Sequence, residues 1–168
     1  MRRIALLAAL ALTVAAGGTV AEGRRDLTRV VVPDKQEDAL RVLKEWLGAR
    51  GLEVEGHKGF LVLPRGGLPI NLVPIVGKGE LDWIRAYVIY PPQDKYKGSK
   101  EFEQLAAKLN RAQNFLKVFV SDQGDLVVAS NLTFYDELTA RVFDAFVEAF
   151  VQVVKRHILT EEARKMLK

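Results

Sequence analysis

The sequence predicts an α+β domain in which helices pack on an antiparallel sheet. Three observations predict it: an apolar helical stripe near the start of the domain, several short alternating runs separated by turn residues, and a hairpin followed by a long apolar helix. The expected order is helix, strands, helix, β-hairpin and long helix. We expect this domain to cover residues 34–158, after a leader at 22–33 and before a C-terminal tail or short helix at 159–168.

Residues 1–21 have the features of an export signal. Arg2 and Arg3 precede a run of apolar and small residues that ends in the small residues a signal peptidase recognises. The run is short and diluted for a membrane span, which needs about 20 strongly apolar residues. We therefore expect cleavage after Ala21 and no stable membrane insertion afterwards. An uncleaved membrane anchor is the alternative.

This signal predicts an extracytoplasmic protein, either periplasmic or secreted. The chain has no cysteine, which excludes a lipoprotein anchor and any disulfide bond. Its formal net charge is +4, and loss of Arg2 and Arg3 with the signal lowers the charge to about +2. So small a charge gives no support for nucleic-acid binding, and we expect none.

The first half of the domain reads as one helix and four strands. Asp34 is a good N-cap for the helix, and Gly51 ends it. The apolar stripe of this helix consists of Ala39, Leu40, Leu43, Trp46 and Leu47. Strands are expected at 52–56, 60–63, 70–76 and 82–90, separated by turns that contain Gly or Pro. Pro74 predicts that the third strand lies at an edge of the sheet or carries a bulge.

The second half begins with a helix that Ser99 caps. A hairpin follows, with strands at 116–120 and 126–129. In its turn, Gly124 supplies the positive φ, and the neighbouring aspartates supply local hydrogen bonds, so the pairing is antiparallel. Thr160 is placed to cap a short final helix.

The helix after the hairpin has an unusually wide apolar face. Its members are Phe143, Phe146, Val147, Phe150, Val151, Val153, Val154 and Ile158. The apolar arc spans roughly 200°, about twice the ~100° that a helix on a single core needs. Either the N-terminal helix or the tail after Thr160 covers the surplus, or a second copy or another protein does.

The fourth strand has two distinct faces. Ile84, Ala86, Val88 and Tyr90 point to one side, and Trp83, Arg85, Tyr87 and Ile89 to the other. If helices cover the first side, the second exposes the residue types that dominate binding hot spots, unless the long helix or the tail covers that side instead. The predicted partner-binding residues are Trp83, Arg85, Tyr87, Ile89, Phe119, Phe143, Phe146 and Phe150.

No residue pattern predicts catalysis, a metal site or a cofactor site. His57 and His157 have no second His or Cys at the spacing of metal ligands. Residues 77–79 lack the remainder of a phosphate loop, and the turn at 122–125 lacks the spaced oxygens of a calcium loop. We therefore expect a protein that is not an enzyme, with no catalytic residues, no metal and no cofactor.

The order of elements resembles the YbjN family. So do the segment Leu109-Asn110-Arg111 leading into the first hairpin strand, the Asp-x-Gly-Asp-Leu turn at 122–126 and the aromatic helix that follows. The resemblance covers roughly residues 34–157 and implies the fold of type III secretion chaperones and an interaction role without catalysis. Secretion chaperones of this fold are cytoplasmic and acidic, whereas this chain has an export signal and a slight positive charge.

These observations predict an exported protein-binding or assembly module that acts through an apolar and aromatic surface. Its partner is another protein or a second copy of the chain, as a homodimer. The alternative is a small-molecule or lipid-binding protein of the cell envelope. In that case Trp83, Tyr87, Phe119 and the phenylalanines of the long helix line a pocket.

Overall fold

The computed structural model describes residues 27–77 and 81–168. The elements in chain order are β1 (Arg29–Val31), α1 (Gln36–Ala49), β2 (Glu55–His57), β3 (Phe60–Arg65), β4 (Leu68–Ile75), β5 (Asp82–Tyr90), the 3₁₀ turn η1 (Asp94–Tyr96), α2 (Lys100–Arg111), β6 (Lys117–Val120), β7 (Leu126–Phe134), β8 (Glu137–Thr139), α3 (Ala140–Val153), the π turn η2 (Val154–Ile158) and α4 (Glu161–Arg164). The predicted α+β class and order of elements are confirmed. The signal at 1–21 lies outside the described residues.

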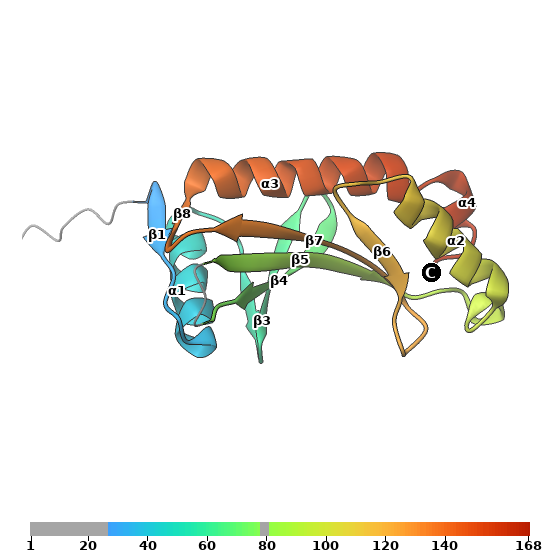
Figure 1. Ribbon diagram of the computed structural model, residues 1–168, viewed down its shortest axis with the longest axis horizontal. Helices are drawn as coiled ribbons and strands as arrows, with labels where there is room; N and C mark the ends of the chain where they lie inside the picture. The colour runs from blue at the N-terminus through green and yellow to red at the C-terminus, as the bar shows by residue number, and fades with distance from the viewer. Residues whose placement is uncertain (1–26, 78–80) are drawn as a thin grey trace, which may run out of the picture.

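Six strands form an antiparallel sheet in the order β2-β3-β4-β5-β7-β6 (Figure 1). Side chains along the central strand β5 alternate between buried and more exposed, which is the pattern of a sheet with one covered face. The covered face packs against α3, with α1 and α2 towards its two ends. The opposite face, which carries Trp83, Arg85, Tyr87 and Ile89 of β5, is the outer face of the sheet.

A second, small sheet joins two strands that the sequence did not reveal. β1 pairs with β8, so that Val30 lies opposite Leu138. Val32 then donates its backbone N–H to the carbonyl of Asp136 at 3.1 Å. Residues 29–32, which were predicted to belong to a leader, are therefore part of the folded domain.

The predicted N-cap of α1 is wrong. The N-cap residue is Lys35, in extended conformation, and no side chain caps the helix. Its carbonyl accepts the backbone N–H of Ala39 at 2.8 Å. The attachment of residues 29–32 to β8 and Asp136 keeps the chain extended, so the helix starts two residues after Asp34.

The prediction that Pro74 places its strand at an edge or at a bulge is wrong for the strand as a whole. β4 lies inside the sheet between β3 and β5, and Pro74 is in regular register opposite Ile84. The ladder with β3 covers only residues 68–72 of β4, so at Pro74 the strand has β5 alone beside it, and the missing N–H costs no hydrogen bond on the β3 side.

The second helix and the hairpin form as predicted. The Ser99 hydroxyl accepts the backbone N–H of Phe102 at 3.2 Å. β6 and β7 pair antiparallel, and Gly124 in the turn has φ +88°. β7 continues to Phe134, five residues beyond the predicted end of the strand, because β5 pairs with it along its whole length.

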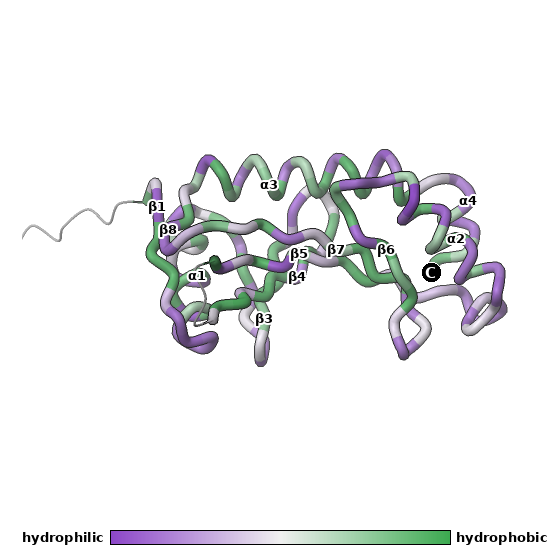
Figure 2. Tube along the Cα trace, viewed as in Figure 1, coloured by the Kyte–Doolittle hydropathy of each residue, from purple (hydrophilic) through white to green (hydrophobic). Residues whose placement is uncertain are grey.

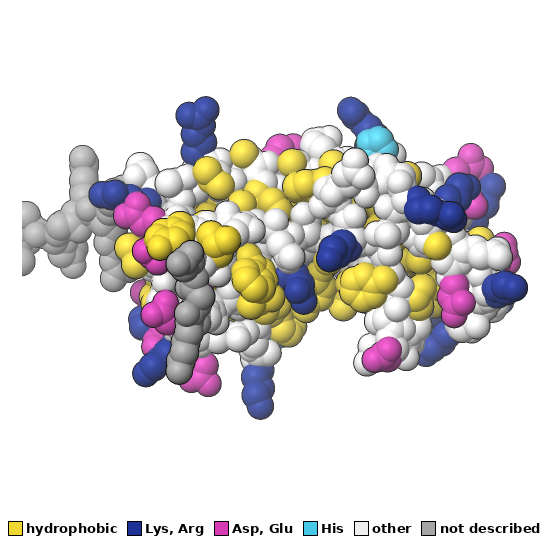
Figure 3. Space-filling view, viewed as in Figure 1, with side chains coloured by type: hydrophobic (Ala, Val, Ile, Leu, Met, Phe, Trp, Pro, Cys, Tyr) yellow, Lys and Arg dark blue, Asp and Glu magenta, His cyan; other side chains and the backbone are white. Residues whose placement is uncertain are grey.

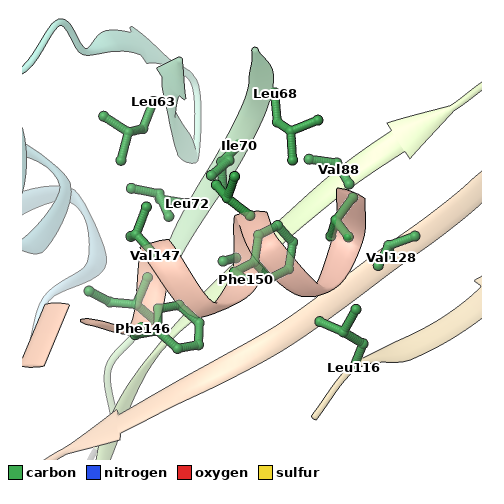
Figure 4. Packing of buried hydrophobic residues seen from close by; sticks show 14 of the residues in the cluster. Leu63, Leu68, Ile70, Leu72, Val88, Leu116, Val128, Phe146, Val147 and Phe150 are labelled. Atoms are coloured by element: carbon green, nitrogen blue, oxygen red, sulfur yellow. The ribbon is translucent and has the colours of Figure 1, made fainter. Parts of the chain in front are cut away.

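The predicted partner-binding role of Phe143, Phe146 and Phe150 is contradicted by their burial. All three are among the core residues, and Phe150 is 0% exposed. Figure 4 shows Phe146, Val147 and Phe150 of α3 lying among side chains of the sheet. Figure 2 shows hydrophobic and hydrophilic stretches alternating along α3, as expected of a helix that buries one face. These phenylalanines are therefore unavailable to a partner.

Two further elements cover the surplus of the apolar arc. The Trp46 ring of α1 contacts the Phe143 ring edge-on, with centroids 5.7 Å apart. At the other end the tail folds back, and Ala163, Met166 and Leu167 are buried. The N-terminal helix and the tail therefore cover the surplus apolar surface of α3 within one molecule. The sequence left open whether segments of the same chain or a second molecule would cover it.

The tail is fastened to the segment between β5 and α2. Thr160 caps α4 as expected, by accepting the backbone N–H of Ala163 at 3.2 Å. Gln93 donates its backbone N–H to Met166 at 2.7 Å, and Lys168 donates its own to Pro91 at 2.9 Å. The Lys168 ammonium also pairs with Asp94, and this contact lowers the pKa of the Asp94 carboxyl.

The turn between β3 and β4 approaches α3 very closely. Gly66 has φ +58°, and a Cβ placed on it would lie 2.6 Å from a methyl carbon of Val151. His157 lies within η2 and is exposed, because this turn buries Val154 and Ile158 and directs the side chains between them away from the core.

Replacement of Phe150 by alanine is expected to destabilise the fold by about 3–5 kcal/mol, because it leaves a cavity between α3 and the sheet. The free energy of unfolding from urea denaturation measures the effect. Phe119→Ala is the matched control, since Phe119 is 48% exposed. Equal losses for the two variants would contradict the assignment of Phe150 to the core.

Tyr90 predicts a loss of stability at high pH. Its hydroxyl is buried with no hydrogen-bond partner among the described residues, and burial raises its pKa from 10.0 to about 12. Between these two values the unfolded chain releases the proton and the folded chain retains it, so stability falls as the pH rises. Tyr90→Phe is expected to fold normally at neutral pH and to lose less stability than the parent at about pH 11. Urea midpoints at both pH values test this, and equal alkaline losses would refute it.

Candidate binding site on the outer face

The outer face carries the residues that β5 was predicted to present. Arg85 and Ile89 are exposed, and Trp83 and Tyr87 are half-buried. Side chains of the neighbouring strands follow in rows, because antiparallel partners lie side by side on the same face. Tyr87 lies opposite Ala129 of β7, which in turn lies opposite Lys117 of β6.

A groove of about 760 Å³ crosses this face above β7. It exists because small side chains, Ala129 and Val127, occupy the middle strand, while larger ones stand on the strands to either side. Neighbouring strands are about 4.8 Å apart, so Tyr87 and Lys117 are separated by roughly two strand spacings with only a methyl group between them. The lining residues are Val73, Arg85, Tyr87, Asn114, Phe115, Leu116, Lys117, Phe119, Val127, Ala129, Ser130 and Asn131.

The segment before β6 forms one wall of the groove and is held firmly. The Ser130 hydroxyl donates to the carbonyl of Phe115 at 2.8 Å. The Asn110 side-chain oxygen accepts the backbone N–H of Val118 at 2.9 Å, which fixes the end of α2 to β6. The Phe115 ring also contacts Phe146 of α3 edge-on at 5.9 Å. Phe115 is therefore supported on its inner side and remains 39% exposed.

The groove is positively charged. Arg85 and Lys117 line it, and none of the described lining residues is Asp or Glu. Arg85 donates from Nε to the Asn131 side-chain oxygen at 3.3 Å, and this bond orients the guanidinium. Burial raises the pKa of Tyr87, so its phenol stays neutral at physiological pH and can donate or accept a hydrogen bond.

Figure 3 shows the same mixture of side chains, with hydrophobic groups next to Lys and Arg over β5, β7 and β6. An arrangement of this kind binds a molecule with an apolar body and polar or anionic groups. Among residues 27–77 and 81–168, no cluster of three His, Asp or Glu side chains is placed to hold a metal ion. No helix in the described part of the chain has the length and apolarity to cross a membrane.

Only some of the predicted site residues come together. Arg85, Tyr87 and Phe119 line the groove. Trp83 and Ile89 lie on the same face without lining it.

The sequence missed other residues of the groove. These are chiefly Phe115, Lys117, Ala129 and Asn131. The alternation of side chains along the hairpin indicates that Lys117 and Phe119 share one face of the sheet. The pairing of β7 with β5, which places Ala129 beside Tyr87, cannot be read from any short stretch of the sequence.

Comparison with known proteins identifies the family. The family model YbjN, described as "Putative bacterial sensory transduction regulator", matches residues 39–160. The solved structure described as "Crystal structure of YbjN, a putative transcription regulator from E. coli" is similar in fold, with a TM-score of 0.58 and 19% sequence identity. The match covers 77% of this chain and 94% of that one. No curated protein matches the chain. Because the family model spans most of the sequence, the chain belongs to the YbjN family.

Proposed function

We propose that this chain is an exported protein-interaction module without catalytic activity, which binds another protein or a second copy of itself through the outer face of the sheet. One observation carries the proposal. Exposed apolar and aromatic residues gather on a face that no described helix covers, including Ile89 at 44% and Phe119 at 48% exposure. Clustered exposed apolar side chains on a folded domain mark an interaction site.

The composition of the face also supports protein binding. Trp, Tyr and Arg are the residue types most enriched at binding hot spots, and Trp83, Tyr87 and Arg85 lie on one strand. The family description, a sensory transduction regulator, names a role that contact with another protein can serve. The contact surface proposed here excludes the phenylalanines of α3, because the monomer buries them.

Export is supported by the sequence of residues 1–21 alone. Two arginines followed by an apolar run and small residues fit a signal that is removed on export. The partner would then be a protein of the cell envelope or of the exterior.

A test of the interface uses charge placed on the outer face. Ile89→Arg and Phe119→Arg are each expected to weaken association by about 2 kcal/mol or more if the residue is a hot spot, because a guanidinium group replaces a desolvated apolar contact. Size-exclusion chromatography with light scattering measures self-association, and affinity capture from the native envelope with binding assays measures a partner.

Val142→Arg is the matched control. Val142 is 47% exposed, but it lies on α3, which covers the opposite face of the sheet. It is expected to leave association unchanged. A strictly monomeric chain that retains no envelope protein would remove the support for an interaction module.

Export and cleavage of the signal are tested by the mass and the location of the protein isolated from its natural host. The expected mature chain begins at Glu22 and is recovered from the envelope or the medium. A mass that includes Met1, together with recovery from the cytoplasm, would refute export and cleavage. Recovery of the intact chain in the membrane fraction would indicate an uncleaved anchor.

A further inference from the structure

We propose that the groove on the outer face binds a free fatty acid, with the aliphatic chain on the floor formed by Ala129 and Val127 and the carboxylate held by Arg85 and Lys117. This site goes beyond the protein contact proposed above. It occupies one part of the outer face and does not depend on that contact.

The shape of the groove suits an unbranched apolar chain. Val127 and Ala129 form a floor that is nearly buried, at 9% and 8% exposure. Phe119 and Phe115 stand beside it and present ring surface to the groove. An aliphatic chain laid on this floor would cover the exposed rings and displace water from apolar surface on several sides.

The charge of the groove favours an anionic ligand. Among the described residues no Asp or Glu forms an ion pair with Arg85 or Lys117, and the one side-chain hydrogen bond of Arg85 to a described residue uses Nε and leaves the two terminal nitrogens available. Guanidinium binds a carboxylate with two parallel hydrogen bonds, and the ammonium of Lys117 adds a second positive charge. The neutral phenol of Tyr87 lies in the same row as Lys117 and offers a further donor.

The backbone of the floor favours a small ligand over an extended peptide. Val127 and Ala129 are paired with β5 on one side and with β6 on the other, so the backbone directly under the floor has no free edge to which a peptide strand could add, although the ladder with β6 ends at Ala129. Recognition here comes from side chains only. The volume of about 760 Å³ also lies in the range of small-molecule sites.

The test uses decanoate as the probe and the full chain after removal of retained lipid. Binding is measured by titration calorimetry and by shifts of the backbone amide signals of β6 and β7. Decanoate is expected to bind, while 1-decanol and decyltrimethylammonium, which lack the negative charge, bind at least about tenfold more weakly, because a charge-assisted hydrogen bond is lost. Equal binding of all three probes would show mere apolar adsorption and overturn the proposal.

Two sets of variants locate the site. Arg85→Gln combined with Lys117→Gln is expected to weaken decanoate binding about tenfold or more. Lys100→Gln, which removes an exposed cation of α2, is the control and leaves binding unchanged. Ala129→Leu fills the floor and is expected to abolish binding. If that variant fails to fold, the double variant at the exposed residues Arg85 and Lys117 still tests the site. Unchanged decanoate affinity in the double variant would refute the site.

The outcome is separable from the proposed protein contact. Trp83→Ala changes the outer face away from the floor, since Trp83 lies opposite Thr133 and does not line the groove, so it is expected to affect protein association and spare decanoate binding. Failure of decanoate to bind, with an acidic amphipathic peptide binding instead, would overturn the fatty-acid site and leave the protein contact standing.

Discussion

The packing of α3 on the inner face of the sheet is the contact on which the remaining structure depends. Its aromatic side chains fill the space above Ile70, Leu72 and Val88, which come from two different strands. With about 25 cal/mol gained for each Å² of apolar surface removed from water, a few fully buried phenylalanines supply a large part of the favourable free energy of a small domain. α1 and the tail complete this contact from two ends.

Every described long helix lies on one side of the sheet, and this arrangement leaves the side chains on the other side uncovered. Strand residues alternate, so a sheet with one covered face exposes half of its side chains. In β5 and its neighbours that exposed half is aromatic, apolar and cationic instead of uniformly polar. Most antiparallel sheets with a wet face carry polar residues there, so this composition is the reason to assign the face a ligand or a partner.

The sequence allowed the local features to be predicted and missed the distant ones. The bounds of β5, the turn at Gly124 and the cap at Ser99 follow from patterns within a few residues. The pairing of β1 with β8 joins segments more than a hundred residues apart, and its absence from the prediction led to the wrong N-cap at Asp34. The wide apolar arc of α3 was detected correctly, but periodicity alone could not tell whether the same molecule or another one covers it. The groove could not be predicted either. It arises where the strand register places small residues of β7 between larger ones of β5 and β6, and only the folded sheet defines that register.

The C-terminal tail has a consequence for how the folded domain can open. Met166 and Leu167 belong to the core, and Lys168 bonds to Pro91. The tail is therefore held by the segment between β5 and α2, and not by α3 alone. Detachment of the tail from that segment would uncover the apolar end of the long helix and give local unfolding a place to begin.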